Sequence, residues 1–196
     1  MAQSKKLPPD IHSEFADLPS NMVGEIVNGT LHAQPRPARP HGRASFELGV
    51  ELSGPFDRGR RGGHGGWKFL TEQELHLGPQ IVVPDISGWK VERYPAHETT
   101  NYSTVPPDWL CEVLSPSTQS LDRLHKLKIY AEHGVKHCWY VDPILRSLEV
   151  FILSNRTYLV GPGFTGNDAV TAPPFEAHTF ELGILWDTPP HNEATP

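Results

Sequence analysis

The stretches VVPDISGWK (82–90), DWLCEVLSPS (108–117) and TQSLDRLHK (118–126) decide the interpretation of this chain. Two carboxylates, Asp85 and Glu112, stand in apolar runs that are typical of buried strands, and a lysine follows on a predicted helix. Mg²⁺ takes oxygen ligands and is usually held by one or two carboxylates, with waters and substrate phosphates completing the octahedron. The pattern therefore predicts a divalent-metal site between neighbouring strands.

Each carboxylate taken alone has a simpler interpretation. A charge in an apolar strand is unfavourable unless it is paired or bound to a metal, so a single acidic residue there is more often a salt-bridged strand end. Asp85 and Glu112 occur together and precede a lysine-bearing helix, which favours the metal site. A lysine there can orient or deprotonate an attacking water, or neutralise charge on a phosphate.

Further strands and helices are indicated on both sides of this stretch. Asn28-Gly29 between two alternating runs (24–33) predicts an antiparallel hairpin, and apolar residues at every fourth position predict a helix over 41–52. The other expected elements are a short helix at 11–18, strands at 67–70, 74–77, 81–89, 109–114, 137–141, 147–153 and 157–161, and a helix from about 115 to 133. This order is α+β, with a strand–helix–strand crossover at 110–141.

Length and composition predict a single loop-rich domain. The 196 residues include 20 prolines and 17 glycines, and 37% are hydrophobic, which suits one domain with irregular connections. We expect an N-terminal tail with a short helix (1–20), a domain (21–187) with a central mixed β-sheet flanked by helices, and a disordered C-terminal tail (188–196).

Targeting signals and metal-binding cysteine motifs are not found in the sequence. No secretion signal and no run of about 20 apolar residues is present, so we expect a cytoplasmic protein without a membrane partner. Cys111 and Cys138 lie in apolar runs, where cysteine behaves as a small hydrophobe, so we expect both to be reduced. The cysteines lack a CxxC partner and the histidines lack HExxH spacing, which argues against zinc.

The net charge of −6 argues against a protein that coats nucleic acid by neutralising its phosphates. Basic residues nevertheless gather in the segment 36–68, as Arg36, Arg39, Arg43, Arg58, Arg60, Arg61 and Lys68. This segment is the candidate phosphate-facing surface; the alternative is a solvated, flexible loop. Its glycine-rich run 59–66 matches neither GxGxxG nor the P-loop pattern, so we expect a mobile loop.

Pro84-Asp85 and Glu112-Val113-Leu114 resemble the PD-(D/E)xK superfamily of restriction-endonuclease-like proteins. More narrowly, the chain resembles the bacterial Uma-two family of restriction endonuclease-like proteins, long catalogued as a domain of unknown function. The similar segments extend from residue 24 to residue 186 and include 112–118, 122–126, 130–131, 134–135 and 139–143. The resemblance implies a restriction-endonuclease-like core for nearly the whole ordered chain.

The resemblance also implies an activity, namely the metal-dependent endonucleolytic hydrolysis of phosphodiester bonds in DNA. Asp85, Glu112 and the main-chain carbonyl of Val113 would bind Mg²⁺ or Mn²⁺. The superfamily's usual lysine, two residues after the glutamate, is replaced by Leu114. The position matching Lys126 on the next helix would take over its catalytic role.

The helix itself leaves the choice of lysine open. On a 3.6-residue wheel Lys126 lies away from the centre of the apolar face, whereas Lys128 lies between Leu121 and Leu124. That face comprises Leu121, Leu124, Leu127 and Ala131. The resemblance supports Lys126 as the catalytic lysine, and Lys128 is the fallback. The simpler alternative is that both lysines lie on a solvated helix face, with Lys126 paired to Asp122.

Three further residues rank lower as site candidates. Glu25, His41 and Glu47 would face a metal or a phosphate if the helix at 41–52 flanks the site, and His41 is more simply an N-terminal helix residue. The acidic net charge and the displaced lysine also motivate a nuclease-fold binding module that does not cut. A hydrolase of a small phosphorylated molecule is the third hypothesis. A homodimer would suit double-strand cleavage, which needs two sites.

Overall fold

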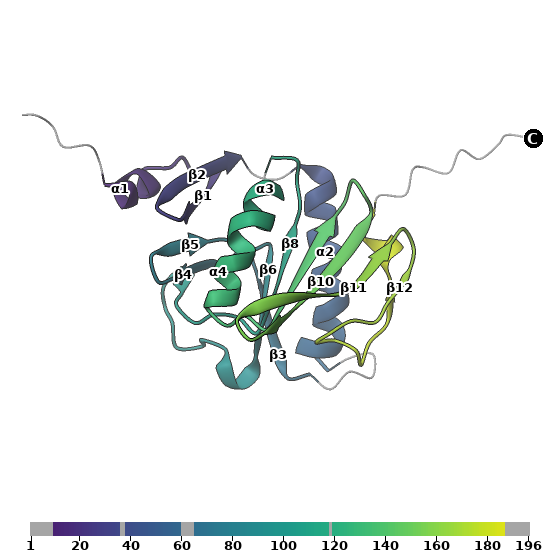
Figure 1. Cartoon of the computed structure of the whole chain (residues 1–196). Helices are drawn as coiled ribbons and strands as arrows, with labels where there is room; N and C mark the ends of the chain where they lie inside the picture. Colours follow the sequence, from purple (N-terminus) through teal and green to yellow (C-terminus); the bar gives the residue numbers. More distant parts are fainter. Residues whose placement is uncertain (1–9, 36–37, 60–64, 118, 187–196) are drawn as a thin grey trace, which may run out of the picture.

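A computed structural model describes residues 10–35, 38–59, 65–117 and 119–186 of the chain, as two large β-sheets with a few helices (Figure 1). The six-stranded sheet has the spatial order β11 (Thr157–Thr165), β10 (Ser147–Ser154), β9 (His137–Asp142), β8 (Trp109–Val113), β6 (Ile86–Lys90), β3 (Trp67–Thr71). The five-stranded sheet has the order β2 (Thr30–Pro35), β1 (Met22–Val27), β5 (Gln80–Val82), β4 (Glu74–Leu77), β7 (Tyr102–Ser103). A small third sheet pairs β12 (Ala169–Val170) with β13 (Phe180–Glu181).

The helices connect and cover these sheets. They are α1 (Ile11–Ala16), α2 (Arg39–Leu52), α3 (Gln119–Leu121) and α4 (Leu127–Glu132), with π turns at Ser53–Asp57 and Asp122–Lys126 and 3₁₀ turns at Val91–Arg93 and Leu182–Leu185. The α+β class is confirmed. None of the described helices is long and apolar enough to span a membrane.

Two local predictions are confirmed by the backbone. Asn28 and Gly29 have positive φ angles of 53° and 76° and join β1 to β2 in an antiparallel hairpin, as the primed turns of such hairpins require. The segment from β8 through the helix to β9 is the expected crossover, because β8 and β9 are parallel neighbours. Two other expectations, the tail at 188–196 and most of the loop at 59–66, lie outside the described residues.

The expected strand at 81–89 is wrong as a single strand. It is divided into β5 and β6, which belong to different sheets, and residues 83–85 form the bend between them. Pro84 has no N–H to donate to a strand ladder, and the N–H of Val83 donates to the side chain of Glu25 instead. Asp85 therefore stands where the chain passes from one sheet to the other.

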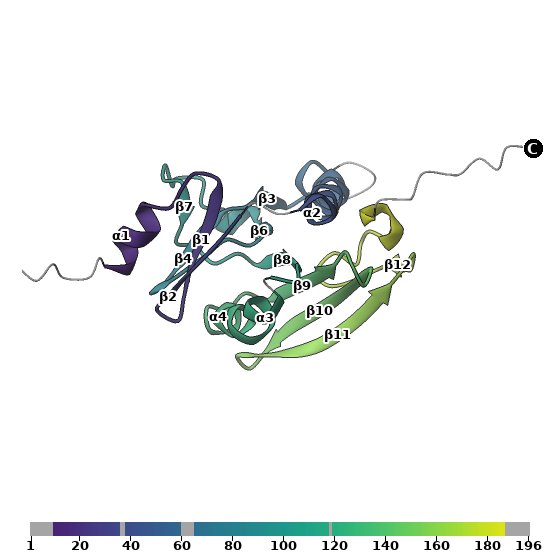
Figure 2. The same ribbon diagram turned by 90° about the horizontal axis from the view of Figure 1, so that it is seen from above.

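Strand β8 separates two hydrophobic cores. Its residues 109, 111 and 113 pack toward α2, and residues 110 and 114 pack with α4. Figure 2 shows α2 and the α3–α4 helix on opposite sides of β8. Cys111 and Cys138 are both buried and free, and they lie in different cores.

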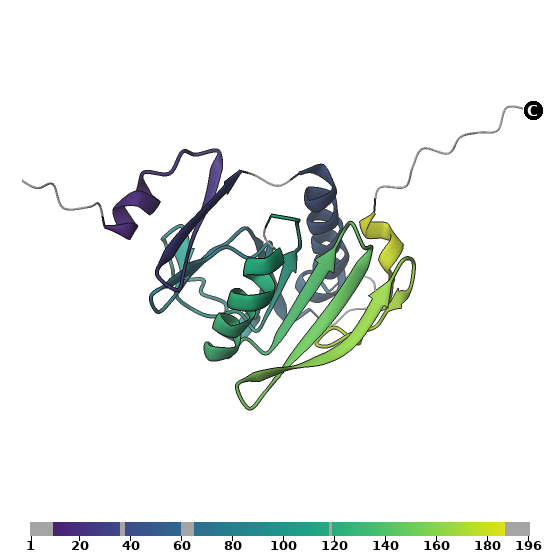
Figure 3. The ribbon, with the colours of Figure 1, turned by 45° about the horizontal axis from the view of Figure 1, so that its top comes forward.

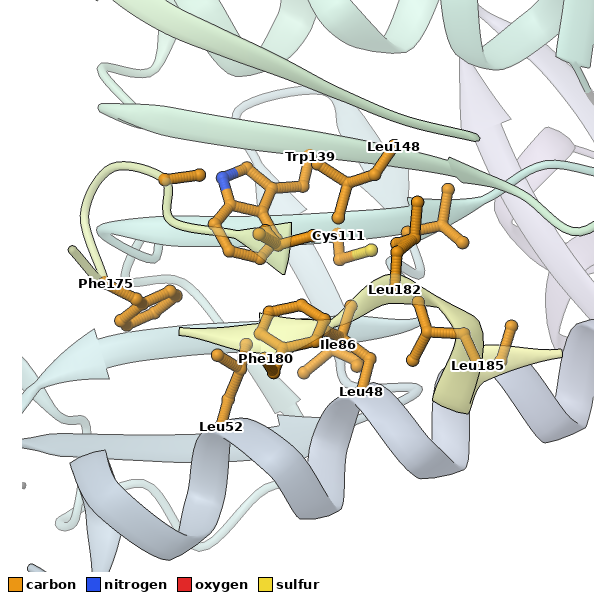
Figure 4. Close-up of a cluster of buried hydrophobic side chains, with 14 of the residues drawn as sticks. Leu48, Leu52, Ile86, Cys111, Trp139, Leu148, Phe175, Phe180, Leu182 and Leu185 are labelled. Carbon is orange, nitrogen blue, oxygen red and sulfur yellow. The ribbon is translucent and has the colours of Figure 1, made fainter. Parts of the chain in front are cut away.

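The core on the α2 side is closed by the C-terminal segment (Figure 4). Phe180, Leu182 and Leu185 fill the space between α2 and the sheet, where they meet Leu48 and Leu52. A buried side chain of this size contributes roughly 1.5–3 kcal/mol. This packing holds α2, whose first turn carries His41, in a fixed position relative to β8.

Candidate active site

The carboxyl end of β8 opens into a cavity of about 340 Å³. In Figure 3 the β1–β2 hairpin, the start of α2 and the α3–α4 helix lie around this end of the strand. The titratable side chains that line the cavity are His41, Glu72, Asp85, Glu112, Asp122 and Lys126. The structure thus brings the two carboxylates and the lysine singled out in the sequence into one place.

Asp85 is fixed by the end of the β6–β8 ladder, in which Cys111 is the last paired residue of β8. Beyond it, the N–H of Val113 donates to Oδ2 of Asp85 at 2.7 Å, so the side chain takes the place of a strand partner. Oδ1 of Asp85 lies 3.2 Å from Nε2 of His41, and 14% of the aspartate side chain is exposed. Asp85 is accordingly held in place and reachable from solvent.

Glu112 is buried on the face of β8 that packs against α4. Its Oε1 lies 2.7 Å from Nζ of Lys126 and accepts a hydrogen bond from the hydroxyl of Tyr130. Burial raises the pKa of Glu112 well above its ordinary value, and Lys126 offsets this only in part because Asp122, Asp85 and a further carboxylate raise the pKa as well. Negative charge is therefore in excess around Glu112.

Lys126 is the buried cation of the site, with 3% of its side chain exposed. Its Nζ lies 2.8 Å from Glu25, 2.7 Å from Glu112 and 3.3 Å from Asp122. Burial lowers the pKa of Lys126, but the three carboxylates outweigh that effect and raise the pKa well above its ordinary value. Lys126 is therefore an ammonium whose three N–H donors face three carboxylates.

Lys128, the fallback, does not reach the site. Its side chain is 79% exposed and its Nζ is 3.9 Å from Glu132. Lys126, in contrast, ends the π turn Asp122–Lys126, a feature that occurs frequently at functional sites. The carbonyl of Asp122 in this turn accepts a hydrogen bond from the hydroxyl of Tyr140 on β9 at 2.5 Å, which ties the turn to the sheet.

The expected apolar face of this helix is wrong at Leu124, which is 70% exposed. Lys126 precedes Ile129 and Tyr130 by three and four residues, so the three share one helical face, and all three are buried. A wheel that counts only apolar residues misses this face, because the charges on it are matched by carboxylates from β1 and β8.

Glu25 joins the site although it ranked low in the sequence. It lies on β1, it is 2% exposed, and its Oε1 accepts a hydrogen bond from the N–H of Val83 at 2.8 Å in addition to its contact with Lys126. Sequence reasoning did not assign a role to Tyr130, whose hydroxyl donates to Glu112. Its position four residues after Lys126 was the available signal.

His41 also joins the site, whereas Glu47 does not. Burial lowers the pKa of His41, but the hydrogen bond and the charge of Asp85 outweigh it, so the pKa is raised above 6.5. Glu47 is paired with Arg43 at 2.8 Å and is not among the cavity-lining residues. The difference arises because only the first turn of α2 reaches the cavity.

The basic segment 36–68 contributes few free charges among the described residues. Arg43 is paired with Glu47, and Lys68 lies 2.5 Å from Asp57. Arg36, Arg60 and Arg61 lie outside the described residues. Among the described residues that line the cavity, acidic side chains outnumber basic ones, so a phosphate there would be favoured by an accompanying cation.

The donor set suits a hard divalent cation. Within the described residues no three histidine, cysteine or acidic side chains converge as a ready-made metal cage. Mg²⁺ is commonly bound by only one or two carboxylates and keeps several waters. Asp85, Glu112 and Val113 all line the cavity. The excess of negative charge around Glu112 is the property that a bound cation would relieve.

Comparisons with known proteins identify a family and a fold for the chain. The model of the Uma2 family, described as "Putative restriction endonuclease", matches residues 12–184. No match was found among the curated proteins. A solved structure, described as a putative nuclease belonging to DUF820 from Anabaena variabilis ATCC 29413, has 21% sequence identity, covers 91% of this chain and 97% of its own, and superposes with a TM-score of 0.73. The likeness shows a shared restriction-endonuclease-like fold, and the family match shows that the chain belongs to the Uma2 family of putative restriction endonucleases.

Proposed function

We propose that the protein is a divalent-metal-dependent endonuclease that hydrolyses phosphodiester bonds in DNA. Asp85, Glu112 and the main-chain carbonyl of Val113 would hold Mg²⁺ or Mn²⁺. The observation that carries the proposal is the convergence of Asp85, Glu112 and Lys126 on one cavity, where Nζ of Lys126 lies 2.7 Å from Oε1 of Glu112. When bound, such a metal polarises the phosphodiester and lowers the pKa of an attacking water.

Lys126 would act by its charge rather than as a base. Its pKa is raised, so it carries a proton at neutral pH and cannot take one from water. Its contacts with Glu25, Glu112 and Asp122 hold Glu112 at the cavity. If one of these contacts is given up, the freed N–H can donate to the charge that develops on the phosphate.

His41 would orient Asp85. Nε2 of His41 lies 3.2 Å from Oδ1 of Asp85, while Val113 holds the other oxygen. A protonated His41 and a metal ion would compete for the same carboxylate charge. Metal affinity is therefore expected to weaken as the pH falls.

A second candidate is a nuclease-fold binding module that does not cut. The observation that favours it is the set of three carboxylates around Lys126, which occupies all the donors that a catalytic lysine would offer to the substrate. The two candidates differ in whether the protein cleaves the DNA that it binds.

A nuclease that cuts both DNA strands would require two sites, and we propose a homodimer for that case.

The test uses isosteric changes at the two carboxylates and a matched change outside the cavity. Asp85→Asn and Glu112→Gln are expected to abolish both Mn²⁺ binding by calorimetry and cleavage of plasmid DNA, with an unchanged circular dichroism spectrum. Glu47→Gln, an acid on α2 outside the cavity, is the control and should keep both properties. Full cleavage by either cavity variant would rule out the ligand assignment, and metal binding without cleavage of any DNA would favour the binding module.

A further inference from the structure

The turn between β9 and β10 exposes two large aliphatic side chains beside the candidate active site. Ile144 is 67% exposed and Leu145 is 71% exposed, and Pro143 precedes them. Single exposed apolar residues are common on proteins, but an adjacent pair forms a patch that water contacts unfavourably. The pair is therefore a candidate contact surface.

This turn is held rigidly by hydrogen bonds. Oδ1 of the buried Asp142 accepts hydrogen bonds from the N–H groups of both Ile144 and Leu145, each at 2.9 Å. The turn ends at Arg146, which has a positive φ of 50° and whose carbonyl accepts a hydrogen bond from the N–H of Gly166 at 2.8 Å. The two aliphatic side chains are thus exposed to solvent on a turn that hydrogen bonds hold in place.

The position of the turn follows from the sheet. Strands β8 and β9 are parallel, with Val113 opposite Val141, so both strands end at the same edge of the sheet. A second cavity of about 220 Å³ lies at this edge, and Leu114, Ile144 and Leu145 are among the residues that line it. It shares Ser115 and Pro116 with the cavity that contains Asp85 and Glu112.

The chemistry of the two adjoining cavities differs. The cavity that contains Asp85 and Glu112 is lined by carboxylates and a lysine and suits a metal-bound phosphate. The cavity beside Ile144 and Leu145 has an apolar wall. A nucleotide has two corresponding parts, a phosphate and a base whose flat faces stack on apolar surfaces, joined by a sugar. Leu, Ile and Pro are residues that DNA-binding proteins insert between base steps, which unstacks the bases and bends the duplex.

We propose that Ile144 and Leu145 insert into the base stack of duplex DNA next to the phosphate held at Asp85 and Glu112. The inference rests on the proposed nuclease function and specifies its substrate as a duplex distorted at the site of cleavage. The rigid turn suits this role because a wedge must keep its shape while the bases separate. The phosphate then enters the acidic cavity while the neighbouring base lies against the aliphatic wall.

The chain offers a matched control for this wedge. Leu159 and Val160 on β11 form another adjacent exposed aliphatic pair, 58% and 78% exposed. Leu159 pairs with Ile152, at the opposite end of β10 from the β9–β10 turn. The double variant Leu159→Ser/Val160→Ser therefore removes two exposed aliphatic side chains far from the site, one on each face of β11.

The experiment records base unstacking and cleavage, with Mg²⁺ present, on a set of duplexes of one sequence in which 2-aminopurine replaces one adenine at a time. Wild-type protein and the β11 control are expected to raise the 2-aminopurine fluorescence. Ile144→Ser/Leu145→Ser should give no rise and, at subsaturating DNA, should cut about tenfold more slowly, since burial of an aliphatic side chain changes binding by roughly that factor.

The remaining outcomes test the wedge and the nuclease function separately. Cleavage without a rise in fluorescence, or an equal rise in the Ile144→Ser/Leu145→Ser variant, overturns the wedge and leaves the nuclease proposal intact. A rise that depends on the pair but without cleavage contradicts the nuclease proposal alone. If the variant instead dissociates a dimer in sedimentation velocity with unchanged fluorescence, the pair contacts a second copy and the wedge is wrong. No binding of the duplex by wild-type protein contradicts both proposals.

Discussion

Lys126 and Lys128 stand two residues apart on one helix and have opposite environments. Lys126 is 3% exposed, with carboxylates of Glu25, Glu112 and Asp122 around it, whereas Lys128 is 79% exposed and 3.9 Å from Glu132. The lysine ammonium group is thus buried among carboxylates at position 126 and solvated at position 128. The comparison shows that partners on other elements decide which lysine is buried.

The energetic consequence of each position is different. A buried ion pair is stabilising only when its partners stay matched, and removal of one partner leaves charges in a region of low dielectric. An exposed pair at i,i+4 contributes little, because water screens it and two flexible side chains must be ordered. The buried face of the helix is therefore sensitive to single substitutions and the exposed face is tolerant.

The largest effect is expected for Lys126→Met compared with Lys128→Met. Loss of the buried ammonium leaves three carboxylates facing one another, so the free energy of unfolding should fall by about 3–5 kcal/mol. The same change at the exposed Lys128 should stay within about 0.5 kcal/mol. Urea denaturation of both variants measures the difference, and equal losses would show that the buried cluster does not depend on its lysine.

A smaller effect is expected in the pH dependence of stability without added metal. The pKa of Glu112 is raised above 4.5 by burial and by neighbouring carboxylates, so the folded state holds this proton more tightly than the unfolded state does. The stabilising contribution is complete below pH 4.5 and is lost as the pH rises through the folded-state pKa. The pKa of Lys126 is raised from 10.5, so its charge stays constant across that range.

Two charge-neutralising variants isolate this pH dependence. Glu25→Gln removes one carboxylate beside Lys126, and the loss of stability with rising pH should become shallower. Glu132→Gln, beside the exposed Lys128, should leave the slope unchanged. Chemical denaturation at a series of pH values provides the measurement. A slope that responds equally to both variants would contradict the excess of negative charge at the buried face of the helix.

Patterns close together in sequence predicted the arrangement of the strands well. The Asn28-Gly29 hairpin follows from local turn chemistry, and the β8–β9 crossover and the hydrogen bond from Val113 to Asp85 follow from strands that neighbour each other. The hairpin needs no knowledge of distant contacts, because turn residues and apolar alternation act within a few positions, whereas the hydrogen bond from Val113 to Asp85 joins residues 28 positions apart.

The remaining features depend on contacts between distant segments. The break of the expected strand at 81–89 requires Glu25 to accept the N–H of Val83. The burial of Lys126 likewise requires carboxylates from β1 and β8. A single sequence states that these residues are polar, and periodicity then assigns polar residues to the surface. The rule fails here because the charges are matched within the fold.

The smallest effect is expected at Leu124, where the sequence and the structure disagree about the buried face. Leu124 is 70% exposed, so Leu124→Ala should change the free energy of unfolding by no more than about 0.5 kcal/mol. Ile129 shares the face of Lys126 and is 2% exposed. Ile129→Ala should therefore lower the free energy of unfolding by about 2–5 kcal/mol. If the two alanine variants instead lose the same stability in urea, the helix buries its leucine face and the charge cluster cannot form. Because Lys126 and Leu124 lie on opposite faces, the leucine variant reports on the lysine's position without altering any charge.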